Sequence, residues 1–484
     1  MKKASFRVFA VLLVTGAIAV LVANKPPVDD SYVIISWNDL GMHCANKDFA
    51  NICVLPPYNN LKAQVILKGN ATSLPQLVTS GFSVNYSVPG NTVSTNKTNF
   101  WDYEDQLFGV NLPPNIGLTG VGLSGTMAVA TPENDHFFVD GIPVTPYQDN
   151  DLVNEDPYQL ALVELHDNQN NLIVQAQPVI PVSNEINCVS SGCHSSEAQI
   201  LNMHEDEGGF DPNDTPILCA ECHSSNALGT PGMPGLESLS QVIHEQHGEE
   251  TNDCYKCHPG PNTQCHRDIM HTMGMVCQDC HGSVDEVGQS IDDGREPWLE
   301  EPQCGNTDCH GSNYAEEQGK LFRQSRGHGG LFCSACHGSP HALYTSENDR
   351  DNQQIIALQG YAGILRECSV CHGVTPAFPG PHGYIPTSVD QLEGEVKESL
   401  LLSVPQPNPF KERTVISFNI DKTGKTYLDI FDQNGKQMVR LVSENLGKGQ
   451  YQITFNAPGF APGVYILNLR NNGRESSQKL VLTR

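Results

Sequence analysis

The apolar positions of residues 31–182 fall in short runs that are separated by Gly, Pro and Asn. The runs are rich in β-branched residues, which is typical of strands, and no long segment with a helical repeat competes with them. We therefore expect an all-β N-terminal domain, either an antiparallel sandwich or a barrel-like fold. The predicted strands are residues 32–37, 63–67, 81–87, 120–130, 160–165 and 172–176.

Residues 403–484 alternate between apolar and polar positions more regularly, with Gly or Asn-Gly at the turns. Short strands at this spacing predict an immunoglobulin-like β-sandwich. The polar, acidic stretch 386–402 before it is interpreted as a linker, and the Pro-containing stretch 175–181 as the boundary at the end of the N-terminal domain. The predicted strands are residues 414–420, 426–431, 437–442, 451–456, 464–469 and 479–482.

Residues 1–23 have the pattern of a secretory signal peptide. Lys2, Lys3 and Arg7 form a basic region, residues 8–22 are broadly apolar, and Ala23 is a small residue suited to cleavage. The apolar run is short for a membrane span, which needs about 20 residues. We expect export and cleavage, with an uncleaved anchor as the alternative.

Between the two β-rich regions, residues 183–385 contain one pattern seven times: two cysteines a few residues apart and a histidine directly after the second. C-x-x-C-H is the attachment signature of c-type haem, in which the cysteines form thioether bonds and the histidine is the proximal iron ligand. We expect about seven covalently attached haem c groups. The motifs are Cys188/Cys193/His194, Cys219/Cys222/His223, Cys254/Cys257/His258, Cys277/Cys280/His281, Cys304/Cys309/His310, Cys333/Cys336/His337 and Cys368/Cys371/His372.

Structural zinc sites and a disulfide framework are the alternatives to haem. Neither explains why a histidine follows the second cysteine in all seven motifs. The first and fifth motifs have four residues between their cysteines instead of two. This longer spacing resembles a variant of small tetrahaem periplasmic cytochromes, in which it still carries haem.

A second histidine on each iron decides between an electron carrier and an enzyme. Iron with two histidine ligands passes electrons, whereas iron with a free face can bind a substrate. We expect most of the remaining histidines of this region to be distal ligands, although any single one could be solvated, and Met203, Met270, Met273 or Met275 could substitute. The distal candidates are His204, His244, His247, His266, His271, His328, His341 and His382, with His43 as a weaker candidate that could instead bond within its own loop.

Seven haems in about 200 residues leave too little chain to bury an ordinary apolar core. The porphyrins themselves are expected to form the core of residues 183–385, surrounded by short helices and irregular loops. Neighbouring haems would then lie close together.

The formal net charge is −27, which argues against binding to nucleic acid because phosphates would not be neutralised. A cationic partner or an oxidised metal ion fits this charge better. Haem attachment uses 14 of the 17 cysteines and leaves Cys44, Cys53 and Cys265. In an oxidising compartment Cys44 and Cys53 are expected to form a disulfide, and Cys265 a free thiol, with a single-thioether haem as the alternative at Cys265. Residues 133–156 are acidic, and we interpret them as a solvated face rather than a calcium site.

Two stretches of the N-terminal region resemble a family of secreted multihaem cytochromes. The first is Trp37-Asn38-Asp39-Leu40-Gly41-Met42-His43-Cys44, and the second is Pro56-Pro57-Tyr58-Asn59-Asn60-Leu61. The run from Cys254 to Pro261 is similar to the same family. The resemblance implies an extracellular electron-transfer protein.

Residues 403–484 resemble the C-terminal sorting domain of the type IX secretion system. The resemblance rests on Pro407-Asn408-Pro409-Phe410, on Gly463-Val464-Tyr465 and on the ending Lys479-Leu480-Val481-Leu482. It implies recognition by the type IX secretion machinery and transfer from the periplasm to the cell surface or the medium.

The sequence therefore predicts an exported heptahaem cytochrome that carries electrons to redox partner proteins or extracellular acceptors, and not an enzyme. Two alternatives stay open. One is a multihaem reductase of a small oxyanion or nitrogen compound with one open haem, although no motif ends in lysine. The other is a homo-oligomer, as a subunit of a cytochrome filament.

Overall fold

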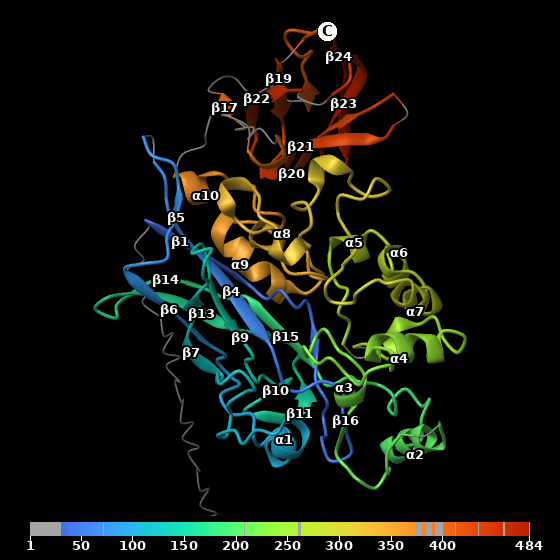
Figure 1. Ribbon diagram of the computed structural model, residues 1–484. Helices are drawn as coiled ribbons and strands as arrows, with labels where there is room; N and C mark the ends of the chain where they lie inside the picture. Colours follow the sequence, from blue (N-terminus) through green and yellow to red (C-terminus); the bar gives the residue numbers. More distant parts are fainter. Residues whose placement is uncertain are drawn as a thin grey trace, which may run out of the picture.

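The computed structural model describes residues 31–70, 72–207, 209–259, 263–373, 380–383, 390–392, 400–411, 413–433, 435–457 and 460–483. It has a β-rich N-terminal part, a middle part of short helices and loops, and a C-terminal β-sandwich (Figure 1). The predicted signal peptide and most of the predicted linker 386–402 lie outside the described residues. Within the described ranges no helix combines the length and the apolar character that crossing a bilayer requires.

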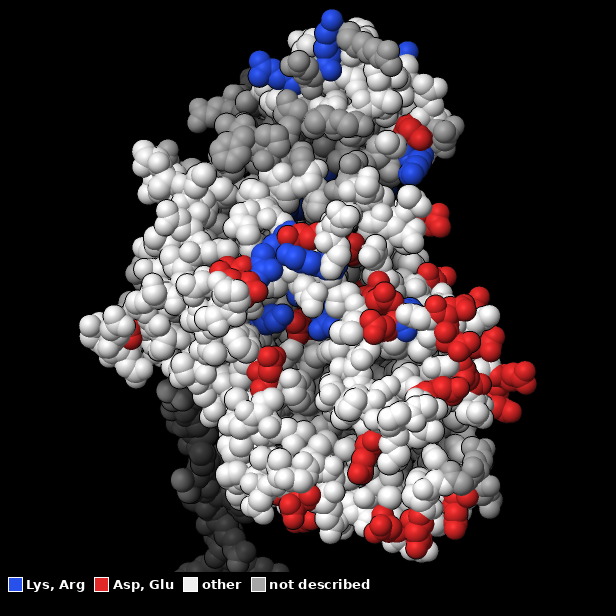
Figure 2. Space-filling model, viewed as in Figure 1, with Lys and Arg blue, Asp and Glu red and all other residues white. Residues whose placement is uncertain are grey.

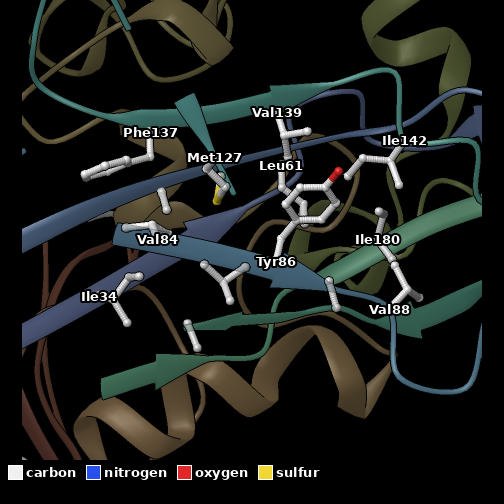
Figure 3. Packing of buried hydrophobic residues seen from close by; sticks show 14 of the residues in the cluster. Ile34, Leu61, Val84, Tyr86, Val88, Met127, Phe137, Val139, Ile142 and Ile180 are labelled. Atoms are coloured by element: carbon white, nitrogen blue, oxygen red, sulfur yellow. The ribbon is translucent and has the colours of Figure 1, made fainter. Parts of the chain in front are cut away.

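Two sheets enclose the core of the N-terminal part. Ile34, Leu61, Val84, Val139 and Ile180 are among the buried side chains between them (Figure 3). The first sheet has the order β1-β4-β9-β8, with β5 also on β4, and the second has the order β14-β13-β6-β7. Their strands are β1 (Tyr32–Trp37), β4 (Asn60–Leu67), β5 (Gln76–Leu77), β6 (Phe82–Ser87), β7 (Ser124–Thr126), β8 (Ala128–Val129), β9 (Phe137–Asp140), β13 (Leu162–Asp167) and β14 (Leu172–Ala176).

The six predicted N-terminal strands are confirmed as strand regions, but a helix and several strands were missed. Helix α1 (Phe100–Phe108) buries Phe100 and Leu107 against the loop around Phe49. Strand β15 (Val179–Ser183) occupies the predicted boundary and is buried along its whole length. Pro181 has no backbone N–H to donate within this strand. It fits at this position because the neighbouring strands are short and leave gaps in the hydrogen-bond ladder. The smaller strands are β2 (His43–Cys44), β3 (Ile52–Cys53), β10 (Tyr147–Gln148), β11 (Asp151–Glu155) and β12 (Tyr158–Leu160).

The two runs that resemble secreted cytochromes form one buried polar network. The Asn38 amide donates to the Asn60 carbonyl over 2.9 Å, and the Asn59 amide donates to the Pro181 carbonyl over 2.7 Å. Asp39 is buried and forms a 2.6 Å ion pair with Lys62. Buried amides and carboxylates need hydrogen-bond partners, and these side chains supply partners for one another and for the backbone where the loop crosses the end of the sheet.

The expected disulfide between Cys44 and Cys53 is wrong, because both are free thiols. The two cysteines lie in different short strands. Cys44 in β2 pairs with β15, whereas Cys53 in β3 pairs with β16 (Ile217–Leu218). Burial and the nearby Cys265 thiol raise the pKa of Cys44, and burial and the nearby Cys219 thiol raise that of Cys53.

The middle part contains only short helices among the described residues, as expected. Of the described residues between Ala220 and Phe332, Ile291 is the one buried hydrophobic side chain, while Met273 and Leu299 are exposed. This stretch therefore has no apolar core built from its described side chains alone. Its helices are α2 (Glu197–Glu207), α3 (Cys219–Cys222), α4 (Leu239–His247), α5 (Ile269–Thr272), α6 (Cys277–His281), α7 (Val284–Asp292), α8 (Cys333–His337), α9 (Asp349–Gln359) and α10 (Ser369–His372).

The last third of the middle part packs on the outer face of β1. Trp37 and Phe332 have ring centres 5.3 Å apart, within a small core that also includes Ile35, Ala335 and Val370. Figure 1 shows α8, α9 and α10 beside this sheet. The interface joins the two parts through packed apolar side chains as well as through the parallel pairing of β3 with β16.

The C-terminal part is a sandwich of two four-stranded sheets, as predicted. The sheet orders are β17-β22-β19-β18 and β21-β20-β23-β24. Leu402 is fully buried in its core, so the end of the predicted linker belongs to the sandwich. The strands are β17 (Asp390–Leu392), β18 (Leu401–Leu402), β19 (Arg413–Ile420), β20 (Gly424–Phe431), β21 (Gln437–Leu446), β22 (Gly449–Asn456), β23 (Gly463–Asn471) and β24 (Arg474–Leu482).

Gln354 closes the exposed edge of β1. Its side chain accepts a hydrogen bond from Ser36 N (3.0 Å) and donates one to Ser36 O (2.8 Å). Gln354→Ala would leave both buried backbone groups without a partner, so we expect a loss of roughly 2–4 kcal/mol in urea unfolding of the full chain. Gln353→Ala, on the exposed side of the same helix, is the matched control and should change little. Equal stability of the two variants would contradict this account of the interface.

Candidate metal centres

Each motif closes one turn of chain that brings its histidine back over its first cysteine. The amide of His223 donates to Cys219 O over 3.1 Å, and the amide of His258 donates to Cys254 O over 2.9 Å. The two motifs with longer spacing close the same bond, from His194 to Cys188 (3.1 Å) and from His310 to Cys304 (3.2 Å). The additional residues are therefore accommodated within an irregular turn, and the histidine amide still bonds to the carbonyl of the first cysteine.

The polypeptide does not cover all of the motif cysteines. The thiols that are exposed each belong to the second cysteine of a motif, and they are Cys193, Cys257, Cys280 and Cys309. At Cys193 the cause is local. Gly192 before it has φ 83°, which glycine adopts without strain, and the chain runs along the surface there. The hydroxyl of Ser191 donates to Cys193 Sγ over 3.5 Å. Cys193 is thus an accessible thiol, and its thioether bond stays a prediction.

Six of the seven motif histidines face a second histidine. The separations between ring centres fall in a narrow range from 5.9 to 6.2 Å. The pairs are His194 with His247 (6.1 Å), His223 with His204 (6.1 Å), His258 with His244 (6.1 Å), His281 with His341 (6.2 Å), His337 with His382 (6.2 Å) and His372 with His328 (5.9 Å).

This separation fits one metal ion between the two imidazoles. Two imidazoles on opposite sides of a metal, each at a metal–nitrogen distance of about 2 Å, have ring centres roughly 6.3 Å apart. Tetrahedral zinc would instead need three or four ligands on one ion. No group of three or more His, Cys, Asp or Glu side chains suited to a metal occurs in the described part of the chain. The paired residues therefore fit a haem with two axial histidines.

Helix α4 orients two of the distal candidates. Nδ1 of His244 donates to Ser240 O (2.6 Å), and Nδ1 of His247 donates to Ile243 O (2.7 Å). Because Nδ1 carries the proton, Nε2 keeps its lone pair for a metal, and the ring orientation is fixed. A side chain at Gly288 of α7 would meet the Glu245 backbone nitrogen at 3.0 Å, so this glycine lets α4 and α7 pack closely.

Burial keeps several paired histidines neutral. It lowers the pKa of His258 to about 4, assisted by the nearby His244 and His281. Burial together with His382 and His310 lowers the pKa of His337 to about 4. Only a neutral imidazole can bind a metal through its lone pair, so these surroundings suit ligands.

The remaining histidine candidates have other contacts. His266 lies 5.3 Å from the ring of His271 and has Nε2 3.2 Å from Asp268, while His271 binds Glu347 over 3.0 Å. His43 donates through Nε2 to Pro56 O (2.8 Å), and burial lowers its pKa to about 4. This contact agrees with a histidine bonded within its own loop and leaves the distal assignment of His43 without support.

The fifth motif differs from the others, because the aromatic ring beside His310 is Tyr314, at 6.2 Å. The same tyrosine ring lies 5.1 Å from His382. Tyr314 was not singled out from the sequence. Its place four residues after a motif histidine was the only signal there, and such a spacing is common by chance.

Contacts link particular motifs to one another, and these links give the order of the motifs along the molecule. Asn187 N, beside Cys188, lies 3.5 Å from Cys257 O, which links the first motif to the third. The Gln278 amide lies 3.8 Å from Cys254 Sγ, which links the fourth to the third. A hydrogen bond from Cys254 lowers the pKa of Cys277 to about 6. Leu365 N donates to Cys336 O over 2.9 Å, beside the last motif.

Charge interactions between thiols complete this order, since only groups that lie close together affect each other's pKa. After burial, the largest influence on the pKa of Cys219 comes from Cys188, on that of Cys280 from Cys309, and on that of Cys336 from Cys371. Cys333 also raises the pKa of Cys304. The seven motifs therefore form one path in the order second, first, third, fourth, fifth, sixth and seventh.

The carboxylates of residues 133–156 are engaged with protein groups. Lys97 lies 2.7 Å from Asp149, and Arg350 lies 2.5 Å from Asp156. Burial opposes ionisation of Asp149, but hydrogen bonds from Lys97 and Thr92 hold its pKa at about 2. These ion pairs support a structural role for the acidic residues of this segment rather than a calcium site.

Residues 406–483 match the family model of the secretion system C-terminal sorting domain. No curated protein matches the chain. Among solved structures, the crystal structure of CopC from Methylosinus trichosporium OB3b matches at 19% identity with a TM-score of 0.14, over 18% of this chain and 92% of that chain. A TM-score this low supports no conclusion about the fold.

The chain thus ends in a type IX sorting domain, and the protein is secreted or lies at the cell surface. The sorting domain interacts with the type IX secretion machinery. Its strand β24 is also needed for folding, because Leu480 and Leu482 are buried in the sandwich core.

Removal of residues 403–484 is expected to stop export at the periplasm, because the transported chain then lacks the segment that the machinery recognises. Fractionation of cells followed by detection of the N-terminal part measures this. The reciprocal control joins residues 403–484 to an unrelated periplasmic protein, which should then reach the surface or the medium. Unchanged export of the truncated chain would refute the assignment.

Proposed function

We propose that the protein is an exported multihaem c-type cytochrome that carries electrons along a chain of covalently bound haems. The observation that carries this proposal is the set of six histidine pairs with ring centres 5.9–6.2 Å apart, each of which includes the histidine of a haem-attachment motif. Haem supplies one-electron exchange when bound. The chain's own residues supply attachment, orientation and spacing.

The motif residues divide the work of holding each haem. The two cysteines fix the edge of the porphyrin, the motif histidine binds one face of the iron, and the second histidine binds the other face. Helix α4 contributes the second histidine to two centres, His247 for the first and His244 for the third. One helix thereby fixes two neighbouring haems relative to each other.

The order of contacts between the motifs supports conduction from one end of the middle part to the other. Cys219 and Cys188 lie near each other at the start of this path, and Cys336 and Cys371 lie near each other at its end. The end that includes α10 rests on the N-terminal sheet through Val370. The β-rich part would thus hold that end of the haem chain in a fixed position.

Charge indicates the kind of redox partner. The basic residues between Glu197 and Asp308 are Lys256, Arg267 and Arg295, among many Asp and Glu residues. Figure 2 shows acidic side chains gathered over the side of the molecule where α4 and α7 lie. A positively charged partner protein or an oxidised metal ion would approach this side fastest.

Reversible electron storage tests the proposal on the full chain. Reductive titration should take up seven electrons per chain, and an oxidised, positively charged metal complex should remove them at rates that fall as ionic strength rises. Uptake of far fewer electrons would contradict the proposal.

Substitution of one distal histidine tests the pairing. His328→Ala should convert one low-spin haem to high-spin and add one binding site for carbon monoxide on the reduced protein, because His372 then holds its iron from one side alone. His328 is exposed, so loss of the side chain should not unfold the chain. His271→Ala removes a histidine that faces no motif histidine and is the matched control. Equal spectra for the two variants would contradict the pairing.

A further inference from the structure

We propose that the fifth centre, at Cys304, Cys309 and His310, is an open haem that binds a small neutral ligand. This inference rests on the proposed function, since it requires haem at the motif. All histidines of the chain lie in the described residues. Six of the seven motif histidines face another imidazole, whereas the ring beside His310 is Tyr314. One face of this haem is thus left without an imidazole.

Five histidines belong neither to a motif nor to one of the six pairs, and their contacts lie elsewhere. His43, His136 and His166 belong to the N-terminal part and bond there to Pro56, Asp135 and Asn85. His266 is buried and lies against Asp268 and the ring of His271. His271 is bound to Glu347. Both belong to the neighbourhood of His341, which is already the partner of His281.

Tyr314 is placed to cover the open face rather than to bind the iron. A phenol oxygen lies about 2.8 Å from its ring centre, and the bend at that oxygen would place the ring centre of an iron-bound tyrosine roughly 7 Å from that of a histidine across the iron. The observed separation is 6.2 Å. The ring is also half exposed and packs against His382 at 5.1 Å.

The loop that carries Tyr314 is tied to the motif at both ends. Glu316 accepts hydrogen bonds from Cys304 N (2.6 Å) and Gly305 N (3.3 Å). A side chain at Gly305 would meet the Ala315 side chain at 2.5 Å, so the chain segments around these two residues lie close together. Tyr314 N lies 3.1 Å from Gly311 O in the short turn between them. The position of the tyrosine ring is therefore set by local bonds.

The charge around this centre favours a neutral ligand over an oxyanion. The Glu316 carboxylate accepts hydrogen bonds from the backbone of Cys304 and Gly305, and Asp308 lies within the motif. The nearby cations are already paired, Lys320 with Glu317 (3.0 Å) and Arg323 with Glu301 (2.8 Å). An anion would meet uncompensated negative charge here.

Carbon monoxide titration of the reduced full-length protein tests the inference, with the high-spin signal of the oxidised protein as a second readout. We expect one molecule bound per chain, about one seventh of the haem, and one high-spin iron. For the oxidised protein, neutral imidazole should bind and anionic azide should bind at least tenfold more weakly at low salt. Seven attached haems that are all low-spin and take up no carbon monoxide would overturn this inference while leaving the proposed function intact. Fewer than seven attached haems would instead count against the proposed function.

Two substitutions at one position locate the open site. Tyr314→His places an imidazole where the other six centres have one, so the high-spin signal and the bound carbon monoxide should both be lost. Tyr314→Phe keeps the ring and removes only the hydroxyl, so one carbon monoxide per chain should still bind. Carbon monoxide uptake that appears only after Tyr314→Phe would show that the tyrosine oxygen occupies the iron and would overturn the inference. Unchanged uptake in Tyr314→His would place the open iron elsewhere and would equally overturn it.

Discussion

The separation of about 6 Å between facing imidazoles is the constraint on which the middle of this molecule depends. Residues 221–331 bury one hydrophobic side chain, Ile291, among those described. So small an apolar core does not offset the conformational entropy that the chain loses on folding, so its order requires another source of stability. Under the proposed function, a haem between each pair would supply both a large apolar surface and two iron–nitrogen bonds, in addition to its thioether links.

The β-rich part and the haem-binding part are mechanically one unit at their shared face. Trp37 packs on Phe332, and Gln354 closes the edge of β1, so the end of the path near α8 and α10 is held by an ordinary apolar core. At the opposite end, Leu218 and Ala220 beside the second motif belong to a core with Phe49 and Phe100 of the N-terminal part, while α4 buries no side chain. The fifth centre lies within the path, where an open iron would exchange electrons with neighbours on both sides.

Local patterns in the sequence were enough to predict the strands, the sandwich and the seven motifs, because each depends on residues close together in the chain. The sequence did not predict which histidines face each other, because His281 and His341 come together only in the tertiary fold. Strand β15 was hidden by its prolines, which are typical of linkers. The prediction of a Cys44–Cys53 disulfide was wrong for a similar reason. A separation of nine residues does not reveal that the two cysteines lie in strands of different sheets. Tyr314 became a candidate only when its ring was seen beside His310.

The mass of the intact mature chain, recovered from the cell surface or the medium, tests the central claim most directly. The account predicts the mass of the polypeptide plus seven covalently attached haems, which stay attached after denaturation because thioether bonds do not dissociate. A mass equal to that of the bare polypeptide, or a mass increase lost on addition of a zinc chelator, would contradict it.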